Sequence, residues 1–240
     1  MSRGRSRRTS RSKTSAARIV IAIIVVAAAG FGFVELDLTQ VLTGGSETDG
    51  GTTPVATSRD LDGLEVAPAG SMTGYSREKF PHWSDADEFG WKGLPDTSCD
   101  VRDAALIRDG EDVRVAEGCD VISGRWRDPY AGGTYTDPSE IDIDHVVPLA
   151  NAWRSGASSW DEGLRERYAN DPDVLLSAEA GENRSKGDKG PEAWKPPLRS
   201  AWCDYAIRWI AIKAEYELSV NPQESSALQQ MLGSCEGGQS

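Results

Sequence analysis

Apolar positions recur with helical or strand spacing only in the last two-thirds of the chain. Residues 43–69 are rich in Gly, Thr, Ser and Asp and carry few large apolar side chains, which is typical of a flexible linker. From Tyr75 onward, short apolar runs alternate with turn signals. We therefore predict a flexible linker over 36–74 and one folded domain over 75–236, long enough for a single core.

The periodicity within this domain predicts a mixture of helices and short strands. In chain order, the expected elements are a helix over 101–108, strands over 113–115 and 121–126, a strand over 141–146, helices over 150–154 and 160–168, a strand over 174–176, and helices over 178–186, 202–218 and 223–232. Ser158 or Ser159 is the expected N-cap of the helix over 160–168, and Gly187 should end the helix over 178–186. The predicted fold class is α+β.

The first 35 residues have the pattern of an export signal or a membrane anchor. Seven basic residues and no acidic one lie between Arg3 and Arg18, and the sixteen residues that follow carry no charge. As a helix this apolar stretch would span roughly 24 Å, which is short of the hydrocarbon core. The pattern is typical of a secretory signal, with a small-residue cleavage site at 27–29, or of an uncleaved anchor. We expect the body to be secreted, or anchored to the outer face of the cytoplasmic membrane.

Cysteine usage agrees with an exported protein. The four cysteines contain no C-x-x-C pair, so disulfides are favoured over a zinc site. Three pairings are possible, and proximity along the chain favours Cys99–Cys119 and Cys203–Cys235.

The charge of the chain limits what it can bind. The formal net charge is −12, and without the seven basic residues of the leader the chain has 19 basic residues against 38 acidic ones. An acidic body argues against tight non-specific binding of nucleic acid, which depends on neutralising phosphates. The densest basic run of the body follows Asn183 and consists of Arg184, Lys186, Lys189, Lys195 and Arg199. A nucleic-acid site would therefore be a local patch.

Candidate chemistry lies where the strand over 141–146 ends and on the helix over 178–186. Asp144 and His145 are adjacent, and His145 is one of only two histidines in the chain. A neutral imidazole beside a carboxylate supplies a base for water and an oxygen ligand for a divalent cation, as metal-assisted phosphodiester hydrolysis requires. Asn183 would add a second oxygen ligand, and Lys186 would share its helix face.

These motifs also carry a family resemblance. Asp-Ile-Asp-His-Val-Val-Pro at 142–148 and Glu-Asn-Arg-Ser-Lys-Gly-Asp at 182–188 resemble the HNH endonucleases, whose core is the ββα-metal fold. The stretch over 75–235 is similar to secreted actinobacterial HNH proteins related to the C-terminal nuclease domain of GmrSD restriction enzymes. The resemblance implies an α+β fold with a ββα-metal core, additional helices and disulfide staples.

The resemblance implies a role for each candidate residue. His145 would be the general base, Asp144 and Asn183 would hold one Mg²⁺ or Mn²⁺ ion, and Lys186 would contact a phosphate. The substrate would be nucleic acid, with DNA favoured over RNA. Because the third histidine of the family name is absent, a hard, oxygen-ligated ion is expected rather than zinc.

Two other functions stay open at this point. A non-catalytic extracellular binding module on an HNH fold would suit the acidic body, and a phosphodiesterase acting on other substrates would suit an exported enzyme. For His82, within an aromatic cluster, a structural role is favoured over contact with substrate or metal. Trp194 is a candidate for stacking on a base. The sequence leaves the oligomeric state unknown, and membrane contact would involve only an uncleaved N-terminal segment.

Overall fold

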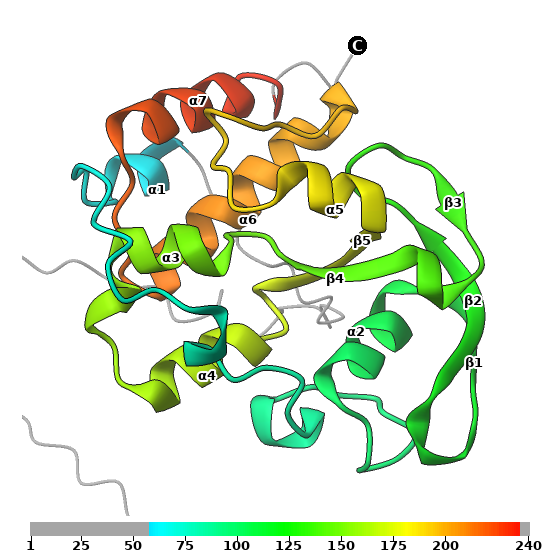
Figure 1. Cartoon of the computed structure of the whole chain (residues 1–240). Coiled ribbons are helices and arrows are strands. Elements are labelled where there is room, and N and C mark those ends of the chain that lie inside the picture. Colours follow the sequence, from blue (N-terminus) through cyan, green and yellow to red (C-terminus); the bar gives the residue numbers. More distant parts are fainter. Residues whose placement is uncertain (1–57, 236–240) are drawn as a thin grey trace, which may run out of the picture. The chain divides into compact units, whose positions relative to one another are not determined.

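The structure, a computed structural model, describes residues 58–235 (Figure 1). The predictions for residues 1–35 and for the first part of the linker lie outside the described residues. None of the helices within the described part is long and apolar enough to cross a bilayer.

The described chain is α+β, as predicted. Its α-helices are α1 (Ser58–Asp62), α2 (Val101–Asp109), α3 (Leu149–Ser155), α4 (Glu162–Asn170), α5 (Ala180–Lys186), α6 (Trp202–Glu215) and α7 (Pro222–Leu232). The strands are β1 (Glu111–Val115), β2 (Val121–Arg127), β3 (Thr134–Tyr135), β4 (Ile141–His145) and β5 (Leu175–Glu179). Strands β1, β2 and β3 form one antiparallel sheet, and β4 pairs antiparallel with β5 in a second. Helix α2 packs against both sheets (Figure 1).

Helices α4 and α5 each begin two residues later than predicted, for a common reason. Helix α4 is capped by Asp161, whose side chain accepts a hydrogen bond from Leu164 N at 2.8 Å, and not by Ser158 or Ser159. Strand β5 runs to Glu179, so α5 begins two residues later than predicted. In both cases a carboxylate satisfies a backbone donor of the first helical turn, which fixes the start of the helix.

The segment over 58–74 corrects the predicted linker, because this part of it packs on the domain. Leu61 of α1 is buried in the main core. Val66 forms a parallel bridge with Val220, and Gly70 N donates to Arg154 O at 2.7 Å. Leu61 is therefore a core residue, Leu64 packs against the core, and the folded unit begins before Tyr75.

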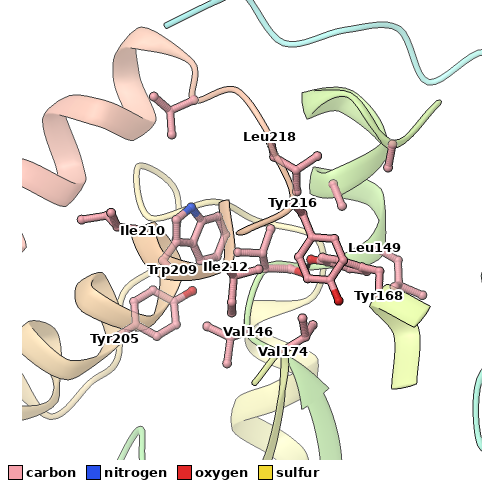
Figure 2. Close-up of a cluster of buried hydrophobic side chains, with 14 of the residues drawn as sticks. Val146, Leu149, Tyr168, Val174, Tyr205, Trp209, Ile210, Ile212, Tyr216 and Leu218 are labelled. Atoms are coloured by element: carbon pink, nitrogen blue, oxygen red, sulfur yellow. Dashed lines mark hydrogen bonds between the residues drawn. The ribbon is translucent and has the colours of Figure 1, made fainter. Parts of the chain in front are cut away.

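The β4–β5 pair lies between two clusters of buried apolar side chains. Ile141, Ile143 and Leu175 belong to a cluster with α2 and β2. Val146 and Val174, just beyond the pair, belong to a larger cluster built from α3, α4, α6 and α7, part of which is drawn in Figure 2. The end of β4, where Asp144 and His145 lie, is thus held by packing on both sides.

Both predicted disulfides are present. Cys99–Cys119 joins the residues before α2 and β2, and Cys203–Cys235 joins the start of α6 to the residues after α7. These bonds restrain elements on both sides of the β4–β5 pair without touching it.

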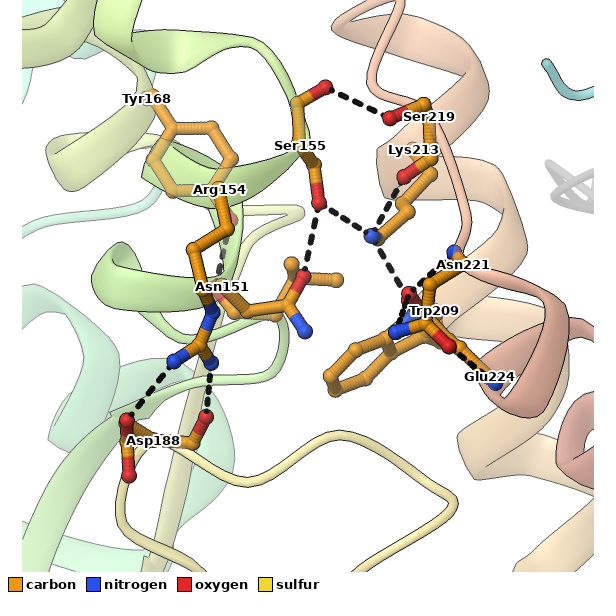
Figure 3. Close-up of polar contacts among 11 residues, drawn as sticks. Asn151, Arg154, Ser155, Tyr168, Asp188, Trp209, Lys213, Ser219, Asn221 and Glu224 are labelled. Carbon is orange, nitrogen blue, oxygen red and sulfur yellow. Dashed lines mark hydrogen bonds and ion pairs between the residues drawn. The ribbon is translucent and has the colours of Figure 1, made fainter. Parts of the chain in front are cut away.

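A buried polar network fixes α3 against α6 and α7 (Figure 3). Lys213 of α6 and Glu224 of α7 form an ion pair of 2.7 Å, and Lys213 Nζ also donates to Ser155 Oγ at 2.8 Å. Trp209 Nε1 donates to Glu224 Oε1 at 2.6 Å. Hydrogen bonds from several elements compensate the two buried charges, which is the condition under which such a pair is tolerated.

Candidate active site

Asp144 and His145 are the last two residues of β4. Asp144 pairs with Leu176 of β5, and His145 pairs with Leu175. Successive side chains of a strand point to opposite faces, so the carboxylate and the imidazole lie on different sides of the strand. The pair therefore presents a carboxylate and an imidazole from adjacent positions without a direct contact between them.

Helix α5 starts directly after β5 and carries the other two predicted residues. The Glu179 side chain caps the helix by accepting a hydrogen bond from Glu182 N at 2.8 Å. Gly187 ends it at φ 55° and ψ −126°, a conformation that L residues rarely adopt. Between these ends, α5 brings Asn183 and Lys186 to the β4 side of the unit. The structure therefore gathers all four predicted residues around one strand–strand–helix unit.

A salt bridge holds the turn after α5 against α3. Arg154 Nη1 lies 3.2 Å from Asp188 Oδ2, and Arg154 Nη2 donates to Asp188 O at 2.9 Å (Figure 3). Since α3 begins four residues after His145, this contact couples the two segments that flank the site.

His145 is held as a neutral imidazole with one nitrogen available. Its side chain is buried, and Nε2 lies 3.0 Å from the carbonyl oxygen of Ala169 at the end of α4. Because a carbonyl only accepts, Nε2 carries the proton and Nδ1 keeps its lone pair. Burial lowers the pKa of His145 from 6.5 to about 3. The imidazole is thus in its base form at neutral pH.

Both oxygens of the Asp144 carboxylate are engaged. Tyr130 donates its hydroxyl to Oδ2 at 2.5 Å, and Lys186 Nζ lies 2.9 Å from Oδ1. Burial raises the pKa of Asp144, while the charge of Lys186 and the hydrogen bond from Tyr130 oppose that rise. These two contacts fix the orientation of the carboxylate and leave it further lone pairs.

The structure corrects the role predicted for Lys186. Its side chain has no exposed surface, and its amino group binds Asp144 Oδ1 and the backbone oxygen of His145, each at 2.9 Å. Burial lowers the pKa of Lys186, and the carboxylate of Asp144 opposes that change. Lys186 is therefore an internal counter-ion of Asp144, and its amino group does not reach a phosphate outside the protein.

A cavity of about 310 Å³ opens over these residues. Its lining includes Asp144, His145 and Asn183. Two exposed cations also line it, Arg77 from the 3₁₀ turn Arg77–Lys79 and Arg184 from α5. Arg184 lies 3.6 Å from Asp142, whereas Arg77 forms no ion pair with the described residues. The cavity therefore joins the base and the oxygen donors to positive charge suited to an anion.

The donor set of this cavity suits a hard divalent ion. Asp144 offers a carboxylate, and the side chain of Asn183 offers an amide oxygen that accepts no hydrogen bond within residues 58–235. Mg²⁺ is often held by one or two protein oxygens together with water and substrate phosphate. No group of three or more His, Cys, Asp and Glu side chains is placed to hold a metal in the described part of the chain. Asp144 and Asn183 are the residues that would bind the ion.

The predicted basic run contributes less to the cavity than its sequence density suggested. Of its five members only Arg184 lines the cavity. Lys195 and Arg199 lie over the ring of Trp202, with centroid distances of 5.0 and 5.1 Å. Trp194, the predicted stacking residue, packs against Tyr130 with ring centroids 5.1 Å apart.

Residues 100–231 match the family model of the GmrSD restriction endonucleases, C-terminal domain. The matched span is more than half of the chain and contains both halves of the site motif. The chain belongs to this family. A relative from Arthroderma benhamiae, named "Uncharacterized secreted protein", is 48% identical over 177 residues, which cover 73% of this chain and 82% of the relative. That relative is fungal, so the similarity is not confined to the predicted actinobacterial branch. No solved structure matches the chain.

Within the GmrSD C-terminal domain match, sequence reasoning missed Tyr130 and the backbone of Ala169. Neither could be recognised locally. An isolated tyrosine after a turn has no motif that marks it as a site residue, and every residue has a backbone carbonyl. Arg77 and His82 precede the matched span and were not placed at the site either. Both lie on the segment between α1 and α2, which passes beside the end of α4; Arg77 lines the cavity, and the His82 ring lies next to that of His145.

Proposed function

We propose that this member of the GmrSD C-terminal domain family is a metal-dependent endonuclease that hydrolyses phosphodiester bonds of nucleic acid, with DNA as the favoured substrate. The family supports a nuclease-type hydrolase, and the cavity supports the same chemistry. The single observation that carries the proposal is the buried His145, fixed at Nε2 by Ala169 O and with no hydrogen-bond partner at Nδ1 among residues 58–235.

In the proposed reaction, His145 Nδ1 takes a proton from a water molecule that attacks phosphorus. The bond from phosphorus to the 3′ oxygen breaks, leaving a 5′-phosphate, and solvent protonates the departing oxygen. The negative charge of a bound phosphodiester favours the imidazolium form, so the base strengthens when substrate is present. Arg77 and Arg184 hold the flanking phosphates. A divalent ion bound by Asp144 and Asn183 would stabilise the negative charge on the phosphate and the departing oxygen.

The proposed cellular location is outside the cytoplasm. The predicted leader and the two disulfides agree with export, and the printed name of the Arthroderma benhamiae relative includes the word secreted. Location restricts the substrate to nucleic acid outside the producing cell.

Nicking of supercoiled plasmid by the purified, disulfide-intact protein tests this proposal. We expect nicking with added Mg²⁺ or Mn²⁺ and none with EDTA, and a higher Mg²⁺ requirement in Asp144→Asn. A protein that cleaves a chromogenic phosphodiester but not plasmid would instead be a phosphodiesterase for other substrates. A protein inactive on both with every divalent ion would contradict the proposal and leave the binding-module alternative.

A further inference from the structure

The two histidines of the chain lie close together although 62 residues separate them. The ring centroids of His82 and His145 are 6.5 Å apart, and the ring planes are inclined by 82°. His82 is partly exposed, whereas His145 is buried beneath it. The sequence had favoured a structural role for His82 within an aromatic cluster, and its position beside the base calls for another explanation.

The end of α4 holds both histidines. Ala169 O fixes His145, and the next residue, Asn170, fixes the backbone around His82. Asn170 Nδ2 donates to Pro81 O at 2.9 Å, and Asn170 Oδ1 accepts from Ser84 N at 3.2 Å. Asn170 is fully buried, so both of these hydrogen bonds are shielded from water. Two consecutive residues, Ala169 and Asn170, thus position both imidazoles relative to each other.

The segment that carries His82 is also held in an unusual conformation. Phe80 anchors it in the core with no exposed surface, and Trp83 has a φ of 65°. Left-handed backbone at a bulky residue costs on the order of 1–3 kcal/mol and persists where the surroundings impose it. Such strain occurs mainly where a side chain must be placed accurately.

Hydrogen bonding leaves one nitrogen of His82 available. Nδ1 lies 2.8 Å from Phe80 O and must donate to it, since a carbonyl only accepts. Nε2 has no hydrogen-bond partner among residues 58–235. With a proton on each ring nitrogen, Nδ1 keeps its bond to Phe80 O while Nε2 points a second donor away from the backbone.

We infer that His82 is a second catalytic residue, whose Nε2 donates a hydrogen bond to a non-bridging oxygen of the phosphate attacked by the water on His145. This inference rests on the proposed nuclease function. His82 lies on the His145 side of β4, while Asp144 faces the other side and pairs with Lys186. His82 is therefore placed to contact the phosphate beside the attacking water, and not to bind the metal.

Two substitutions separate this role from a structural one. His82→Asn places an amide near Nδ1, where it can still donate to Phe80 O, and removes Nε2. His82→Gln places its amide near Nε2 and gives up the contact with Phe80 O. We expect kcat for plasmid nicking at saturating Mg²⁺ to fall on the order of 100-fold in His82→Asn and much less in His82→Gln. Thermal melts of both variants control for folding.

Each other outcome has a defined meaning. A structural role predicts the reverse order, with His82→Asn active and His82→Gln less stable and less active, and this result would overturn the inference. Normal kcat in both variants, or a change only in the Mg²⁺ concentration needed for half-maximal rate, would overturn it too. If the wild-type protein fails to nick while folded, the nuclease function itself fails. If the wild type nicks and His145→Gln does not, the nuclease function holds. In that case, His82 variants with wild-type kcat would contradict only the role inferred for His82.

Discussion

The carboxylate of Asp144 owes its position to two residues that a search for metal ligands would overlook. Tyr130 reaches it from the loop after β2, and Asp128 fixes that loop by accepting from Ala131 N at 2.6 Å and Glu179 N at 3.1 Å. Lys186 reaches it from the last turn of α5. These contacts hold the buried Asp144 carboxylate in one orientation, as its proposed role as a metal ligand requires.

Removing the charge of Lys186 should therefore destabilise the protein. In Lys186→Met, which keeps an unbranched apolar stem but removes the amino group, Asp144 stays buried without its counter-ion. We expect a loss of about 3–5 kcal/mol in the free energy of unfolding, measured by urea denaturation. Lys189→Met, three positions later and exposed, is the matched control and should change stability by less than about 0.5 kcal/mol. Equal stability of the two variants would rule out the counter-ion role.

At the scale of elements, the cavity depends on segments that are far apart in the sequence. Most helices and strands could be predicted from the sequence. The apolar residues of α2, α6 and α7 recur with helical spacing, and Pro148 marks the end of the apolar run that forms β4. The site could be predicted in part, because Asp144, His145 and Asn183 lie on adjacent motifs. Ala169, Tyr130 and Arg77 could not, because each meets the motif only through packing between distant elements. The burial of Lys186 follows from that same packing.

The two cations at the rim come from different elements and should act on substrate binding. Arg77→Ala and Arg184→Ala should each raise KM for DNA with little change in kcat. Each should also reduce the slope of log affinity against log salt by about 1, as expected when one phosphate contact is lost. Arg199→Ala, which removes an exposed cation outside the cavity, is the control. The assignment fails if Arg199→Ala has the same effect as the other two.

At the scale of the whole molecule, an acidic body surrounds a small cavity that has two arginines, Arg77 and Arg184, in its lining. This charge distribution predicts weak and transient binding of nucleic acid, because the body repels the phosphates that the rim attracts.

The buried tyrosines give the whole domain a characteristic response to alkali. Burial raises the pKa of Tyr130, Tyr168 and Tyr205 well above 10. Above pH 10 the unfolded chain loses these protons while the folded chain keeps them, so stability falls as pH rises. We expect absorbance of these tyrosinates near 295 nm to emerge only together with unfolding followed by circular dichroism. Ionisation of all six tyrosines of the chain in a still folded protein would contradict this packing.

The most direct test of the account is the rate of plasmid nicking by His145→Gln. The glutamine amide can keep the contact with Ala169 O, but it offers no base at the position of Nδ1. With saturating Mg²⁺ and an unchanged thermal melt, we predict a fall in kcat of about 10²- to 10⁴-fold relative to the wild type. A folded His145→Gln protein that nicks at the wild-type rate would contradict the assignment of His145 as the general base.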